Sequence, residues 1–233
     1  CCMLDVFQIR CKILPKKELL WEVLQQALIQ FMDSSLFFDE SIGELHHQRR
    51  FKFYCFDQLY PMESNKIYQV GKPYTLTIRT IKKDLAIYFD RVLSHHESSL
   101  LQGKSTEIRT VPYRPIDRLY SITPVVLKND KGYWRDWMTL SEYENQLFIN
   151  LVKKYNESTG KKLDENFTWT NSITFSNRKP IAVKQKNIIL LGDKLELKIS
   201  EHSSAQILAH FALGVGLGGN NARGSGFVNV KWK

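Results

Sequence analysis

Hydrophobic and polar side chains alternate along several short segments of this chain, and between these segments apolar residues recur at helical spacing. Residues 5–14 alternate with period two, which predicts a strand that Pro15 ends. Residues 17–33 place apolar side chains on one helical face, which predicts an amphipathic helix. The same criteria predict strands at 48–60, 72–81 and 107–116 and a helix at 82–96. This order of elements is the ferredoxin-like unit.

The second half of the chain repeats this order more loosely, with one additional strand. Ser141 and Glu144 form a predicted capping box at the start of its first helix. The predicted helices are 139–157 and 202–216, and the predicted strands are 118–128, 167–175, 181–191, 194–200 and 226–232. We therefore expect an α+β fold of two tandem ferredoxin-like (RRM-like) βαββαβ domains, residues 1–115 and 116–233.

Basic residues exceed acidic ones, with 33 Lys and Arg against 24 Asp and Glu, and the net charge is +9. This excess favours a polyanionic partner, nucleic acid first, although a basic enzyme of another kind has the same balance. No apolar run is long enough for a membrane helix, and we expect no secretory signal. The four cysteines lack CxxC spacing, so we expect reduced thiols in a cytoplasmic protein, with no disulfide framework and no zinc site.

Six of the twelve glycines fall within residues 214–228, "GVGLGGNNARGSGFV", between a predicted helix and a predicted strand. A nucleotide-binding GxGxxG loop follows a strand and opens a helix, and the chain has no GxxxxGK[ST] motif. These observations exclude a Rossmann or P-loop site. Residues 223–230 match the RNP1 signature only in part, because aromatic residues are missing and the segment lies outside the expected strand.

Two interpretations of this glycine-rich stretch stay open. The glycines can end the helix and form turns. Alternatively, successive amides form an anion-binding concavity, to which Arg223 adds a guanidinium fork suited to phosphate. We favour phosphate contact because the stretch combines many glycines with an arginine and two asparagines. The predicted binding residues are Gly216, Gly218, Asn220, Asn221, Arg223, Gly224 and Gly226.

The segment "GLGGNNARGSG" (216–226) resembles the G-h-G-x5-G-x-G loop of the CRISPR-associated endoribonucleases that process CRISPR repeat RNA, members of the RAMP superfamily. Ser225 stands where that family has a hydrophobic residue. Similar strings occur at 45–56, 122–128, 150–155 and 205–213. The resemblance therefore covers nearly the whole chain, and it implies a tandem ferredoxin-like fold that grips a repeat hairpin or its flanking single strand.

The resemblance also implies a reaction that needs no metal and no cofactor. The ribose 2′-OH attacks the adjacent phosphate and leaves a 2′,3′-cyclic phosphate and a 5′-OH end, which produces guide RNAs. Histidine suits the proton transfers of this reaction because its pKa lies near neutrality. The Leu-His pattern of the family falls on Leu45 and His46, so His46 is the first catalytic candidate and His47 the second. Adjacent side chains point apart, so only one is expected to face the cleft, and both are ordinary loop residues in the alternative interpretation.

Lys52 and Tyr54 complete the predicted catalytic group. The family often has a lysine on the corresponding strand, and Lys52 shares a predicted strand face with Arg50 and Tyr54. An ordinary exposed strand lysine is the alternative. Some family members add a tyrosine from the first helix. This chain has Phe31, Phe37 and Phe38 in that area, which leaves Tyr54, Ser34 or Ser35 as replacements.

The other histidines and the search for metal-binding patterns indicate no further catalytic site. We interpret His95 and His96 as structural residues at a helix end, His202 as solvated and His210 as a packing residue. No HExxH, DxD, paired Cys/His or GxSxG pattern occurs, so we predict no metal site and no serine-hydrolase site.

Three basic clusters, at 49–52, 152–162 and 177–186, are predicted to contact RNA backbone phosphates. Arg50, Lys184 and Lys186 are the candidates within them, since Lys184 and Lys186 share one strand face. Tyr54, Tyr155 and Trp169 are candidates for base stacking, with a place in the core as the alternative for each.

Three hypotheses for the function follow. The first is a metal-independent endoribonuclease that cuts CRISPR repeat RNA. The second is a non-cleaving RNA-binding subunit of the same superfamily, and the third is a tandem RNA-binding protein without a CRISPR role. The partners that the first hypothesis implies are CRISPR repeat RNA and an effector complex or fused CRISPR-associated domains, with no membrane.

Overall fold

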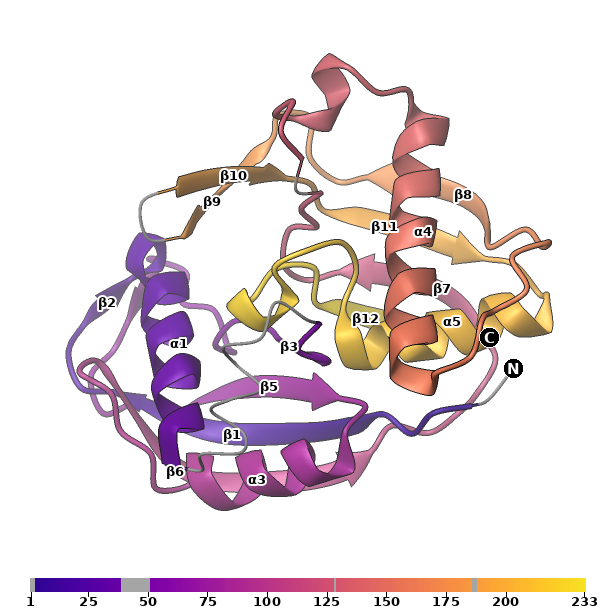
Figure 1. Cartoon of the computed structure of the whole chain (residues 1–233). Coiled ribbons are helices and arrows are strands. Elements are labelled where there is room, and N and C mark those ends of the chain that lie inside the picture. Colours follow the sequence, from indigo (N-terminus) through magenta and orange to yellow (C-terminus); the bar gives the residue numbers. More distant parts are fainter. Residues whose placement is uncertain (1–2, 39–50, 128, 186–187) are drawn as a thin grey trace.

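The computed structural model describes residues 3–38, 51–127, 129–185 and 188–233, and its first half is a four-stranded antiparallel sheet with two helices (Figure 1). The strand order is β3-β5-β1-β6. Two short strands pair beside this sheet, β2 (Leu19–Leu20) with β4 (Ile67–Tyr68), and a 3-10 turn, η1 (Leu36–Phe38), follows α1. The main elements are β1 (Phe7–Pro15), α1 (Trp21–Ser35), β3 (Tyr54–Phe56), β5 (Tyr74–Thr80), α3 (Lys83–Leu93) and β6 (Leu101–Thr110).

The second half is a four-stranded sheet of the order β12-β7-β11-β8, with a hairpin of β9 and β10 inserted before β11. If the four strands of each sheet are numbered in chain order, they lie side by side as 4-1-3-2 in both sheets. This shared order confirms the predicted tandem of ferredoxin-like units. The elements are β7 (Ile116–Ser121), η2 (Trp134–Asp136), α4 (Leu140–Thr159), β8 (Thr170–Phe175), β9 (Ile181–Gln185), β10 (Ile188–Gly192), β11 (Leu195–Ile199), α5 (Ser203–Val215), η3 (Asn221–Arg223) and β12 (Val228–Trp232). Residues 111–115 connect the two sheets, and the division into domains at 115 and 116 stays a prediction.

Several predicted strands were wrong in extent, among them the one expected at 118–128, which is β7 and ends at Ser121. The strand expected at 107–116 is β6, which begins at Leu101 and ends at Thr110, because the prolines at 112 and 115 have no amide to continue the ladder. The strand expected at 181–191 is the hairpin of β9 and β10, in which Gln185 pairs with Ile188. Both arms of the hairpin are rich in apolar residues, so the sequence pattern alone did not reveal the turn.

The predicted capping box of α4 was wrong by two residues. The Thr139 hydroxyl accepts a hydrogen bond from the Glu142 amide at 3.2 Å, and the Glu142 carboxylate accepts one from the Thr139 amide at 2.7 Å. Glu144 instead accepts a hydrogen bond from the Thr170 hydroxyl on β8, and Ser141 is exposed. Two capping-box spacings overlap in this segment, and the one nearer the first helical turn forms.

The alternation predicted for 48–60 is replaced by a short strand that is buried on both faces. Tyr54, Cys55 and the next residue, Phe56, are all buried, and Phe53 has a positive φ of 53°. On one face the Tyr54 ring lies 5.3 Å from the Phe89 ring of α3. On the other face the Cys55 thiol donates to the Leu213 carbonyl of α5 at 3.7 Å. The face that carries Tyr54, which the local pattern assigns to solvent, is therefore packed in the first-half core, and the second half of the chain covers the opposite face.

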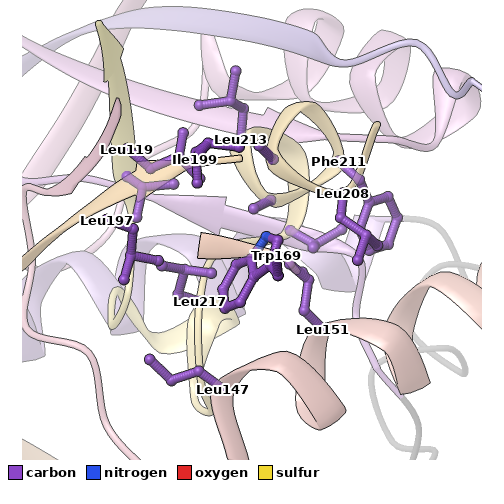
Figure 2. Packing of buried hydrophobic residues seen from close by; sticks show 14 of the residues in the cluster. Leu119, Leu147, Leu151, Trp169, Leu197, Ile199, Leu208, Phe211, Leu213 and Leu217 are labelled. Carbon is purple, nitrogen blue, oxygen red and sulfur yellow. The ribbon is translucent and has the colours of Figure 1, made fainter. Parts of the chain in front are cut away.

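Two hydrophobic cores hold the fold together, and one of them crosses between the halves. The first core lies between the first sheet, α1 and α3. The second core packs α4 and α5 on the second sheet, with leucines from both helices around the Trp169 ring (Figure 2), and it includes Val6, Ile81 and Val111 from the first half. The buried Arg79 adds a hydrogen bond between the two sheets, because its guanidinium donates to the Val228 carbonyl at 2.6 Å.

Candidate nucleic-acid interface

A pocket of about 270 Å³ lies between the segment that leads into β3 and the glycine-rich loop after α5. In Figure 1 this loop, drawn in yellow, lies beside β3, between α1 and α4. The pocket is lined from the first half by residues 51–54 and from the second half by Lys154, Val215 and residues 218–223. It is thus built by segments far apart in the sequence, and both predicted groups of site residues contribute to it.

Close approach of backbone segments explains the glycines of the loop. A Cβ atom at Gly226 would lie 1.9 Å from the Leu217 carbonyl oxygen, and one at Gly218 would lie 2.5 Å from the Val126 carbonyl oxygen. Both glycines also have positive φ, 67° and 65°, a region that residues with a Cβ rarely adopt. Side chains at these positions are incompatible with the observed loop.

Many of the loop amides donate to protein carbonyls. The Leu217 amide donates to the Gly226 carbonyl at 2.9 Å, and the Gly219 amide donates to the Val126 carbonyl at 2.8 Å. The amides of Gly216, Arg223, Gly224, Ser225 and Gly226 have intramolecular acceptors as well. These amides are occupied within the protein, so the predicted amide concavity does not include them, and the outward chemistry of the loop comes mainly from its side chains.

Asn221 holds the loop from within. Its side-chain amide is largely buried and donates to the carbonyls of Leu217 and Ser225 at 2.9 and 3.0 Å. Asn220 and Arg223, by contrast, line the pocket and keep partly exposed side chains. Asn220 and Arg223 are therefore the loop side chains that a ligand in the pocket can reach.

Lys154 of α4 lies beneath the loop and is buried, with 2 % of its surface exposed. Its ammonium donates to the carbonyls of Gly216 and Gly218 at 3.1 and 2.7 Å and to Asn221 Oδ1 at 2.7 Å. Burial lowers the pKa of Lys154 to about 7. Lys154 belongs to the basic cluster at 152–162 that was predicted to contact RNA phosphates, but its spacing from Leu147 and Leu151 puts it on the buried face of the helix.

Arg223 and Lys52 bring positive charge to the rim of the pocket. The Arg223 guanidinium lies 3.6 Å from the Asp33 carboxylate at the end of α1, and Gln25 of the same helix donates to the Arg223 carbonyl at 3.0 Å. Lys52 is partly buried, and its pKa is lowered by desolvation and then by the charge of Arg223. The two cations are thus near enough to influence each other, as a site for a phosphate group requires.

Tyr54 lines the pocket but is almost completely buried. Its hydroxyl lies 3.5 Å from the Ala222 carbonyl, and burial raises the pKa of Tyr54 above its usual range. The phenol is therefore neutral near pH 7. Of the two interpretations given for Tyr54, Tyr155 and Trp169, the structure supports the place in the core over base stacking, because all three rings are packed inside the two cores.

The structure does not test every predicted site residue. His46, His47, Arg50 and Lys186 lie outside the described residues. Lys184 is exposed on β9, at the hairpin that Figure 1 shows reaching toward α1.

Three of the remaining histidines contact other parts of the fold, and His95 is exposed. His96 follows α3 and is buried, with its Nε2 atom 2.8 Å from the Ser34 hydroxyl, so Ser34 is already engaged. His210 is buried against the Tyr113 ring, and burial lowers its pKa to about 4. His202 is exposed, as expected, and its Nδ1 atom accepts the Ser204 amide at the start of α5.

Within the described ranges, no three His, Cys, Asp or Glu side chains are grouped so that they could hold a metal ion. No helix in the described part of the chain is both long and apolar enough to span a membrane. Cys11 and Cys55 are free and buried.

The sequence model of the family described as "CRISPR associated protein Cas6, C-terminal" matches residues 113–230, which include α4, α5 and the whole glycine-rich loop. This chain belongs to the Cas6 family. The resemblance inferred from the glycine spacing is confirmed at the level of the family. The matched segment also contains Lys154, Asn221 and Arg223, so the second-half wall of the pocket is part of the Cas6 domain.

Relatives of this Cas6 chain extend over its first half as well. The CRISPR-associated endoribonuclease Cas6 2 of Methanocaldococcus jannaschii is 25% identical over 244 residues, which cover 95% of this chain and 98% of that protein. A solved structure named CRISPR associated protein Cas6 has a TM-score of 0.71 at 18% identity and covers 97% of this chain and 99% of its own. A structure titled "An RAMP protein binding different RNA substrates" has a TM-score of 0.72 at 16% identity, with coverage of 97% and 99%. The structural matches support the tandem fold over the full length.

Proposed function

We propose that this chain is an endoribonuclease that cuts CRISPR repeat RNA without a metal ion, by attack of a ribose 2′-OH on the adjacent phosphate. The observation that carries the proposal is the pocket in which Lys52 from one half and Arg223 from the other approach the same space. His46 and His47 precede Lys52 by six and five positions. Membership of the Cas6 family and a relative named as an endoribonuclease support the reaction class.

The proposed reaction divides the proton transfers from the charge stabilisation. His46, with His47 as the second candidate, takes the proton of the 2′-OH or supplies one to the leaving 5′-oxygen. Lys52 and Arg223 stabilise the charge that develops on the phosphate. Tyr54 is a neutral hydrogen-bond donor, because burial keeps its phenol protonated. The products are a 2′,3′-cyclic phosphate and a 5′-OH.

The proposed RNA path also uses basic residues that do not belong to the described lining of the pocket. Arg50, Lys184 and Lys186 are proposed to contact backbone phosphates, and these contacts contribute affinity rather than sequence choice. Asn220 and Arg223 contact the strand at the pocket itself. A cytoplasmic location and an effector complex or fused CRISPR-associated domain as partner belong to the same proposal.

A cleavage assay in EDTA tests this function. The substrate is labelled CRISPR repeat RNA of the source organism, beside the same RNA with 2′-deoxy sugars throughout. We expect cleavage of the first and none of the second, with a cyclic phosphate on the 5′ product. Cleavage of the deoxy substrate, or a complete loss of cleavage in EDTA that Mg²⁺ restores, would overturn the mechanism.

Histidine variants then identify the proton-transfer residue. His46→Ala should reduce cleavage by about 10²- to 10⁴-fold and leave the affinity for RNA nearly unchanged. His47→Ala separates the two neighbours, and the exposed His95→Ala is the matched control that keeps full activity. Tight binding by the unmodified protein without cleavage of any repeat RNA would instead indicate a non-cleaving RNA-binding subunit.

A further inference from the structure

We propose that Lys154 is a positioning residue of the RNA site, whose buried ammonium ion holds the glycine-rich loop in shape and whose protonation is coupled to RNA binding in the pocket above it. This inference rests on the proposed function, because it takes the pocket as the place where an RNA phosphate binds. It concerns binding, so it can be tested without cleavage.

The geometry around Lys154 favours the charged form. Its Nζ atom has three acceptors, the carbonyls of Gly216 and Gly218 and the Asn221 side chain, at 3.1, 2.7 and 2.7 Å. An ammonium ion has three N–H donors, whereas a neutral amine has two. Loss of the proton therefore leaves one buried acceptor without its hydrogen bond, and the loop loses one of the three hydrogen bonds that Lys154 donates to it.

The same loop segment forms the wall of the pocket. Asn221 links the ammonium to the carbonyls of Leu217 and Ser225 at 2.9 and 3.0 Å. Arg223 follows two residues later and lies on the pocket rim. Lys154 thus acts on the position of Arg223 through Asn221. Its own side chain is almost completely buried, so it offers a ligand little surface.

No carboxylate in the described part of the chain forms an ion pair with Lys154. Cys55 faces it from β3, and burial raises the pKa of this thiol to about 12, so it is neutral. Tyr54 is neutral for the same reason. Of the residues with described positions, the other titratable or charged groups around the pocket are Lys52, Arg223 and, behind Arg223, Asp33.

Among the residues that the structure describes, none is therefore a full counterion for Lys154, and an anion that enters the pocket supplies one. Burial lowers the pKa of Lys154 to about 7, so at pH 8 a large share of the unbound protein carries the neutral amine. A bound phosphate favours the ammonium ion and raises its pKa. RNA binding should then take up a proton above pH 7, and affinity should fall as the pH rises.

The stability of the unbound chain should increase with pH, whereas the affinity for RNA should decrease. A lysine whose pKa is lowered by folding binds fewer protons in the folded than in the unfolded state between about pH 7 and 10, so its contribution to stability increases with pH there. A purely structural lysine predicts this increase in stability but no proton uptake on RNA binding. The two roles are therefore separable.

Calorimetry of RNA binding measures the proton uptake directly. The His46→Ala/His47→Ala double variant is titrated with the source organism's CRISPR repeat RNA at pH 8, in HEPES and in Tris, whose ionisation enthalpies differ. We expect net uptake of a sizeable fraction of one proton per RNA bound, and an affinity that weakens about three- to tenfold between pH 6.5 and 8.5. Zero uptake together with a flat affinity would overturn the inference.

Two lysine variants identify the residue that takes up the proton. Lys154→Met in the same background should abolish the uptake, while Lys153→Met, which changes the exposed neighbour on the same helix, should keep it. Uptake that persists in a folded Lys154→Met protein would overturn the assignment. If Lys154→Met does not fold, the fall in affinity with pH is compared between the Lys153→Met and parent proteins, and loss of that fall in Lys153→Met would contradict the proposal. If the double variant takes up a proton but the unmodified chain, with both histidines present, never cleaves repeat RNA, only the proposed function is overturned.

Discussion

The guanidinium of Arg223 lies 3.6 Å from the carboxylate of Asp33, and this pair joins the glycine-rich loop of the second half to the end of α1 in the first. Asp33 therefore orients the one arginine of the loop and also neutralises part of its charge. An RNA phosphate at the pocket rim would compete with Asp33 for the same donors.

Asp33→Asn should increase the affinity for CRISPR repeat RNA by about two- to fivefold, since the pair is partly exposed and surface ion pairs contribute up to about 1 kcal/mol. Arg223→Ala should weaken binding and reduce its dependence on salt. Fluorescence anisotropy with labelled RNA at two salt concentrations measures both effects. Glu22→Gln, an exposed carboxylate at the other end of α1, is the control for the change in net charge. Weaker binding by Asp33→Asn would mean that the pair orients Arg223 more than it competes with RNA.

Gly226→Ala should destabilise the chain by more than the cost of a positive φ alone, because its Cβ atom would lie 1.9 Å from the Leu217 carbonyl oxygen. Gly160→Ala is the matched control, with a φ of 66° at the end of α4 and open space around the site of the added methyl group. A cost of about 1–2 kcal/mol is expected for the control. Urea unfolding of both variants provides the comparison, and equal losses would show that the loop adjusts to the clash.

Thr139→Ala should reduce the free energy of unfolding by about 1 kcal/mol, since Thr139 caps α4 by accepting the Glu142 amide. Ser141→Ala should have almost no effect, because Ser141 is exposed and lies inside the helix, where alanine is well tolerated. Thermal and urea denaturation of the two variants measure the difference. A larger loss for Ser141→Ala would contradict the capping geometry.

Asp57→Asn should remove part of the pH dependence of stability. The Asp57 carboxylate accepts the Thr77 amide at 2.7 Å, and burial raises the pKa of Asp57 to about 7. A carboxyl group with a raised folded-state pKa stabilises the fold at low pH, and this contribution is lost as the pH rises from about 4 to 7. The stability of the parent minus that of the variant should therefore decrease over this range. Urea midpoints at several pH values test this, and a constant difference would be the contrary result.

The order of elements was predictable because it depends on local periodicity. The alternation in residues 5–14 and the helical spacing in 17–33 correspond to β1 and α1 within a few residues. The ends of elements were less predictable, as β6 shows, because the partner strand decides where pairing begins. Phe7 to Pro15 of β1 pair along β6 from Thr110 back to Leu101.

The sequence by itself determined the tandem fold, the family and the need for glycine in the loop, because periodicity, turn residues and motif spacing are local properties of the chain. Only the tertiary structure decided that Lys154 lies under that loop, that Tyr54 is buried and that Arg223 pairs with Asp33. Burial, pKa and hydrogen-bond partners arise from residues distant in sequence. Lys154 and Lys153 are adjacent and chemically identical; helical spacing puts Lys154 on the inward face of α4, and packing against the loop then buries its ammonium group.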